Sequence, residues 1–89
     1  MNLQELAKEL DFNTGEEYYF YIVDSLINGQ RQQVKDLFND MQPDDQISFF
    51  NNFLDQSPGI YTREIIKEVR NICIDEAISN KTGFNIELI

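Results

Sequence analysis

The sequence predicts an all-α domain, a small bundle of four to five helices followed by an ordered C-terminal tail. The apolar residues recur mostly at the helical spacing of three and four positions. Capping residues, prolines and glycines stand where these periodic segments begin and end. The length of 89 residues and the apolar fraction of 42% fit a single domain, residues 1–89, with one modest core.

The first two helices are predicted at about residues 2–10 and 15–28. Asn2 is placed to cap the first helix, whose leucines and alanine share one face. Thr14 and Glu17 fit a capping box at the start of the second helix. An Asn-Gly pair marks the end of that helix, because glycine readily adopts the left-handed backbone that stops a helix.

A run of apolar and aromatic residues, 18–23, lies inside the second predicted helix. Aromatic and β-branched residues also favour strands, so this run has a second interpretation as a buried strand. The tail, residues 84–89, alternates apolar and polar side chains with the period of a strand. The alternative fold is therefore α+β, with 18–23 and 84–89 as strands, although the length and caps of the segment favour a helix.

Three further helices are predicted at about residues 30–41, 43–55 and 60–80. The middle one begins with a proline, whose missing N–H costs nothing in a first turn. On the last and longest helix, Ile74 and Ile78 fall outside the main apolar stripe. They need a cover, which either the tail or a second copy of the chain would provide, and we expect a homodimer slightly more than a monomer.

Composition argues against several classes of function. Sixteen acidic residues face seven basic ones, and the net charge of −9 opposes direct binding to nucleic acid or to anionic membranes. The chain has no His, a single Cys and no glycine-rich phosphate loop. We therefore predict no catalytic residue, no metal site and no cofactor. Since no catalytic residue is predicted, we expect that the protein is not an enzyme. The sequence has neither an export signal nor a membrane span, so we expect it in the cytoplasm.

The expected function is a non-catalytic protein-interaction or assembly module. The helix at 15–28 has too many aromatic residues for one stripe, so it is either the central helix or part of an interface. Tyrosine suits an interface because it joins a large apolar ring to a polar tip. The candidate interface residues are Tyr18, Tyr19, Tyr21, Ile74 and Ile78.

Two charged surfaces are further candidates. Arg63, Lys67 and Arg70 share one helix face and form a candidate cationic dock for an acidic partner, although local pairing with acidic neighbours is the favoured interpretation. The alternative function is an acidic inhibitor that mimics nucleic acid and blocks a basic nucleic-acid-binding protein. The candidate acidic face for such mimicry consists of Asp36, Asp40, Asp44 and Asp45. The acidic composition, rich in Asn, Gln and Ile, resembles that of small proteins from bacteria and their mobile elements.

Overall fold

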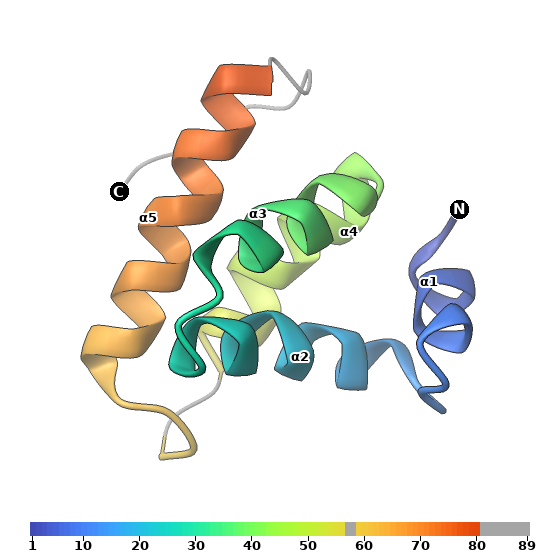
Figure 1. Ribbon diagram of the computed structural model, residues 1–89, viewed down its shortest axis with the longest axis horizontal. Helices are drawn as coiled ribbons and strands as arrows, with labels where there is room; N and C mark the ends of the chain where they lie inside the picture. Colours follow the sequence, from blue (N-terminus) through green and yellow to red (C-terminus); the bar gives the residue numbers. More distant parts are fainter. Residues whose placement is uncertain (57–58, 81–89) are drawn as a thin grey trace.

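The computed structural model describes residues 1–56 and 59–80, and most of this part of the chain is helical (Figure 1). No strand occurs among these residues, so the all-α prediction is confirmed. The elements are α1 (Leu3–Glu9), α2 (Gly15–Ile27), α3 (Arg31–Asp40), α4 (Pro43–Ser48), the π-helix η1 (Phe49–Leu54) and α5 (Arg63–Asn80).

The alternative α+β fold is wrong for residues 18–23, which lie inside α2. Neighbouring helices can cover an apolar run on several sides, so the run needs no sheet. The predicted ordered tail at 84–89 lies outside the described residues.

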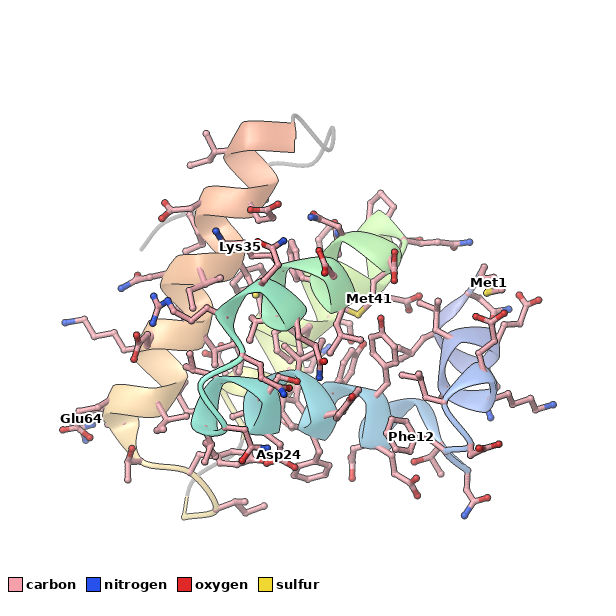
Figure 2. All side chains as sticks on the ribbon, viewed as in Figure 1. Met1, Phe12, Asp24, Lys35, Met41 and Glu64 are labelled. Carbon is pink, nitrogen blue, oxygen red and sulfur yellow. The ribbon has the colours of Figure 1, made fainter. Side chains whose placement is uncertain are left out.

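Figure 1 shows α2 running between α5 and α1, and α2 contacts α1, α3 and α5. Tyr18 and Ile22, one turn apart, are 1% and 0% exposed and belong to an apolar core built from α1, α2, α3, η1 and α5. Figure 2 shows charged side chains such as Glu64 and Asp24 on the outside of this core. The central position of α2 therefore explains much of its aromatic content.

The helix starts follow local hydrogen-bond chemistry. At α1, Asn2 accepts from the backbone N–H of Glu5, and the Glu5 carboxylate accepts from the N–H of Asn2, which completes a capping box. At α2, Thr14 accepts from the Glu17 N–H at 3.4 Å, as predicted. The predicted reciprocal bond differs, because the Glu17 carboxylate accepts from the N–H of Asn13 at 3.2 Å.

The segment predicted as one helix at 43–55 is two elements. Pro43 occupies the first turn of α4, as predicted, but the backbone then changes to the i→i+5 pattern of a π-helix in η1. Within η1, the rings of Phe49 and Phe53 stack with centroids 5.6 Å apart. The last helix also begins later than predicted, at Arg63, because the Thr62 hydroxyl accepts from the N–H of Ile65 and caps it.

Candidate functional site

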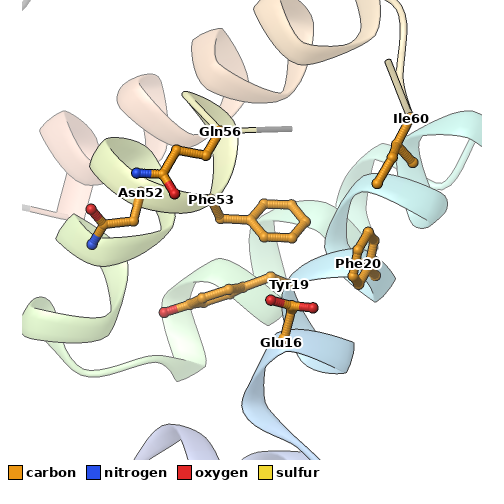
Figure 3. Close-up of a pocket in the computed structure, with 7 residues that line it drawn as sticks. All are labelled: Glu16, Tyr19, Phe20, Asn52, Phe53, Gln56 and Ile60. Atoms are coloured by element: carbon orange, nitrogen blue, oxygen red, sulfur yellow. The ribbon is translucent and has the colours of Figure 1, made fainter. Parts of the chain in front are cut away.

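A pocket of about 300 Å³ opens to solvent between α2, η1 and the loop before α5 (Figure 3). Ligand pockets in proteins range from about 300 to 1,000 Å³, so this one accommodates one or two side chains of a partner rather than a large molecule. We call it the aromatic pocket. Its lining residues are Glu16, Tyr19, Phe20, Asn52, Phe53, Gln56 and Ile60.

One wall of the aromatic pocket is a single face of α2. Glu16, Tyr19 and Phe20 occupy positions i, i+3 and i+4, which lie next to one another on a helix surface. The Tyr19 hydroxyl donates to the backbone carbonyl of Asp45 at 3.1 Å, which fixes the ring. Burial raises the pKa of Tyr19, so this hydroxyl keeps its proton and remains a donor at neutral pH.

The opposite wall comes from η1 and the turn after it. The Phe53 ring meets the Phe20 ring edge to face, with centroids 5.0 Å apart and an interplanar angle of 86°. It also lies 5.3 Å from the Tyr19 ring. Such aromatic pairs contribute about 0.5–1.5 kcal/mol beyond their burial, so the two walls hold each other in place. Asn52 and Gln56 add amide groups to the same wall.

The loop before α5 closes the third side. Gly59 has a φ of 90°, a left-handed conformation that residues with a Cβ rarely adopt. Ile60 follows and is 63% exposed while lining the pocket. The Tyr61 hydroxyl then donates to the Asp24 carboxylate on α2 at 3.0 Å. Burial and this bond both raise the pKa of Tyr61, so the link between the loop and α2 persists at neutral pH.

The pocket is bordered by negative charge. Of the described residues that line it, only Glu16 is charged. The two helices that line it, α2 and η1, contain three acidic residues and no basic one. These acidic residues are Glu16, Glu17 and Asp24. The local potential therefore favours a cationic ligand over an anionic one.

The structure separates the five candidate interface residues. Tyr18 and Tyr19 are 1% and 8% exposed, so their rings belong mainly to the core, although Tyr19 also borders the aromatic pocket. Tyr21 is half-buried and meets the Phe12 ring edge-on at 5.5 Å. Ile74 is half-buried and packs against the core, whereas Ile78 is 64% exposed. These residues therefore do not form one surface patch.

The candidate cationic dock is partly occupied by a local ion pair. Arg70 donates to the Asp55 carboxylate at 2.7 Å, so one of the three cations is paired within the chain, although Asp55 is not among the partners that the sequence suggested. Arg63 and Lys67 are exposed on α5. Among the described residues, the other ion pair joins Arg31 to Glu68. Two of the three side chains of the candidate cationic dock, Arg63 and Lys67, therefore remain available to an acidic partner.

Three of the four residues of the candidate acidic face are exposed. Asp36 and Asp40 lie one turn apart on α3, and Asp44 lies in the first turn of α4. Asp45 is half-buried instead, and its carboxylate accepts a hydrogen bond from the backbone N–H of Leu3 at 3.1 Å. Asp45 therefore connects α4 to the start of α1 rather than extending the acidic face.

Cys73 has the environment of a structural residue. Its side chain is 0% exposed, and burial together with the nearby Glu76 raises the pKa of the thiol. A thiol with a raised pKa is mostly protonated and therefore a poor nucleophile. Within residues 1–56 and 59–80, no three His, Cys, Asp or Glu side chains gather where they could hold a metal ion.

Sequence reasoning missed the aromatic pocket as a site. In the sequence, Phe20 belongs to the aromatic run 18–23, and Phe53 falls inside the helix predicted at 43–55. No local sequence pattern predicts the contact between the two rings, because 33 positions separate Phe20 from Phe53. Phe53 also lies in the π-helix η1, which the sequence did not predict. The sequence feature nearest to the pocket is Ile60, a large apolar residue directly after a Pro-Gly pair.

Comparisons with protein-family models, with curated proteins and with solved structures gave no match to this chain. Within the described part of the chain, no helix has the length and apolar character needed to cross a membrane. The geometry and charge of the surface are therefore what indicates a function for this chain.

Proposed function

We propose that this chain is a non-catalytic protein-interaction module that binds a segment of a partner protein in the aromatic pocket. The observation that carries this proposal is the pocket itself, an open site with three aromatic rings and an exposed isoleucine. Interface centres are rich in aromatic residues, and a few well-packed anchors provide most of the binding energy. The adjoining π-helix adds support, because such segments occur frequently at functional sites.

The rigid walls of the pocket favour binding. The Phe53 ring contacts the rings of Phe20 and Tyr19, and the Tyr61 hydroxyl holds the third side against α2. Side chains that are already ordered lose little conformational entropy when a partner binds.

We place this module in the cytoplasm, because its one cysteine is a free buried thiol, as is usual in a reducing compartment.

A matched pair of variants tests the proposal. Ile60→Asp puts a charge at the edge of the pocket, while Ile27→Asp makes the same change at an exposed isoleucine of α2 outside the pocket lining. A photo-reactive amino acid at position 60 should cross-link a defined protein in the native cells, and position 27 should not. The purified complex should then weaken at least about tenfold with Ile60→Asp and stay unchanged with Ile27→Asp. Equal effects of the two variants would contradict docking in the pocket.

Mimicry of nucleic acid is a second candidate function. It is favoured by the exposure of Asp36, Asp40 and Asp44, which places three carboxylates on α3 and the start of α4. Replacing all three by Asn should abolish binding to a basic nucleic-acid-binding protein, and that binding should fall steeply with salt. Docking in the aromatic pocket predicts the reverse. The triple variant should then bind the partner protein normally, and Ile60→Asp should lose that binding.

A homodimer through the C-terminal half of α5 is a third arrangement. Ile78 is 64% exposed there, so it offers an apolar anchor, while Ile74 is already half-buried against the core. Light scattering at high protein concentration should report a dimer for the wild type and a monomer for Ile78→Glu. A monomeric wild type would remove this arrangement.

A further inference from the structure

We propose that the aromatic pocket binds an arginine side chain of its partner, set in a basic and apolar segment of chain. This inference rests on the proposed function and specifies the chemistry of the occupant. Three features of the pocket support it: its single charge, its aromatic walls and its amide groups.

The charge of the pocket selects a cation. The Glu16 carboxylate is exposed on α2, one turn before Phe20. No basic residue lies among the described lining residues, and the whole chain carries a net charge of −9. An anionic ligand would be repelled by the Glu16 carboxylate, the one charge among the described lining residues. A second copy of this chain would bring the same net negative charge, so self-association at this site is also disfavoured.

The walls are suited to a guanidinium group. Aromatic rings carry negative potential on their faces, and arginine stacks on such rings while retaining its charge. Tyr19, Phe20 and Phe53 supply three rings around the same space, as Figure 3 shows. The aliphatic stem of the arginine would lie against Ile60, at the loop side of the pocket.

The polar groups of the pocket match the donors of arginine. A guanidinium has five N–H donors and no acceptor. Glu16 offers two carboxylate oxygens, and Gln56 offers an amide oxygen. The Asn52 side-chain NH₂ already donates to the Ser48 hydroxyl at 3.1 Å, which leaves its amide oxygen as an acceptor. Lysine would make fewer of these contacts, because its ammonium group is compact and cannot form a planar fork.

The test is a titration of the ¹⁵N-labelled 89-residue chain with short peptides, followed by nuclear magnetic resonance. The probe is acetyl-Ala-Leu-Arg-Leu-Ala-amide. A matched peptide contains citrulline, which keeps the shape of arginine and lacks its charge, and a third contains glutamate. We expect the arginine peptide to shift the amide signals of Glu16, Phe20, Phe53 and Ile60. The citrulline peptide should bind roughly two- to fivefold more weakly at low salt, and the glutamate peptide should not bind.

Two variants locate the effect. Glu16→Gln should reduce binding of the arginine peptide to the level of the citrulline peptide. Glu9→Gln makes the same change in net charge at an exposed residue of α1 outside the pocket lining, and it should leave binding unchanged. Equal losses in the two variants would show general attraction to an acidic protein, and would overturn the inference.

The outcomes separate this inference from the proposed function. If the citrulline or glutamate peptide binds in the pocket as well as the arginine peptide, the pocket is a docking site but not one for a cation. If no peptide shifts the pocket signals while Ile60→Asp still disrupts the native complex, the inference is again wrong and the proposed function stands. If Ile60→Asp also has no effect on that complex, both are wrong.

Discussion

Each side of α2 carries an aromatic ring, but the two sides differ in what covers them. Tyr18 and Ile22, four positions apart, face the core and are almost completely buried. Glu16 and Phe20, also four positions apart, lie on the other side of the helix and line an open pocket. The difference arises from what covers each side, since α3 covers the first pair, and η1 with the loop before α5 only partly encloses the second. Exposure of an aromatic ring in this helix is therefore set by tertiary packing.

The largest expected effect on stability comes from truncating one aromatic side chain on each side of α2. Tyr18→Ala should lower the free energy of unfolding by about 3–5 kcal/mol, because it leaves a cavity in the core. It also removes the hydroxyl that donates to the Leu37 carbonyl at 2.7 Å. Phe20→Ala should cost only about 1–2 kcal/mol, because its ring is half-buried. Urea unfolding followed by circular dichroism measures both values.

A small domain has a stability of only about 5–15 kcal/mol, so Tyr18→Ala should remove a large fraction of it. Equal losses for the two variants would show that the pocket side of α2 is as tightly packed as the core side. The distinction between a core face and a binding face would then be lost.

Alkaline pH gives the next largest effect. Burial, with a smaller contribution from Asp40, raises the pKa of Tyr18 above the usual value of 10.0, and the pKa of Tyr61 is raised as well. The unfolded chain therefore loses these protons at a lower pH than the folded chain. Their contribution to stability is fully present below about pH 10 and is lost as pH rises above it.

Urea unfolding at a series of pH values, with tyrosinate absorbance as a second signal, measures this loss. Tyr61→Phe should remove the part of the pH dependence that comes from the loop, and Tyr18→Phe the part that comes from Tyr18. The contributions of Tyr19 and Cys73, whose pKa values burial also raises, should remain. A stability that stays constant from about pH 9 to about pH 11 would contradict the raised pKa values.

A smaller effect concerns the first turn of α2, which carries Glu16 into the pocket. Thr14→Ala removes the side chain that accepts from the Glu17 N–H and should cost about 1 kcal/mol. Thr14→Ser keeps the hydroxyl and serves as the control. Thermal unfolding measures the loss, and signals from Glu16 should broaden in the alanine variant if the first turn frays. An unchanged melting temperature would mean that the bond from Asn13 to the Glu17 carboxylate is sufficient by itself.

Local signals made the all-α fold predictable. The caps at Asn2 and Thr14 and the proline at the start of α4 act within one turn, so the sequence alone indicates where those helices begin. The change to a π-helix at Phe49 has no comparable signal, because the residues of η1 fit an ordinary amphipathic helix equally well. The predicted helix starts were therefore more accurate than the predicted geometry of this segment.

The candidate site was less predictable, because it depends on contacts between distant residues. Counting aromatic residues in α2 indicated that one stripe could not hold them all, but not which of them would remain accessible. Tyr18 and Phe20 differ by two positions, and only the placement of α3 and η1 decides that the first is buried and the second borders a pocket. The sequence placed Ile74 and Ile78 together outside the apolar stripe of α5, whereas in the structure Ile74 packs against the core and Ile78 is 64% exposed.

The smallest expected effect on stability belongs to the two matched variants at the surface. Ile60 and Ile27 are 63% and 51% exposed, so most of each side chain already contacts water in the folded chain. Substitutions at such positions usually change the free energy of unfolding by no more than about 0.5 kcal/mol. Ile60→Asp and Ile27→Asp should therefore unfold at nearly the same urea concentration as the wild type. If Ile60→Asp alone were strongly destabilising, Ile60 would be a structural cover for Phe20 and Phe53, and a loss of partner binding in that variant would no longer indicate docking.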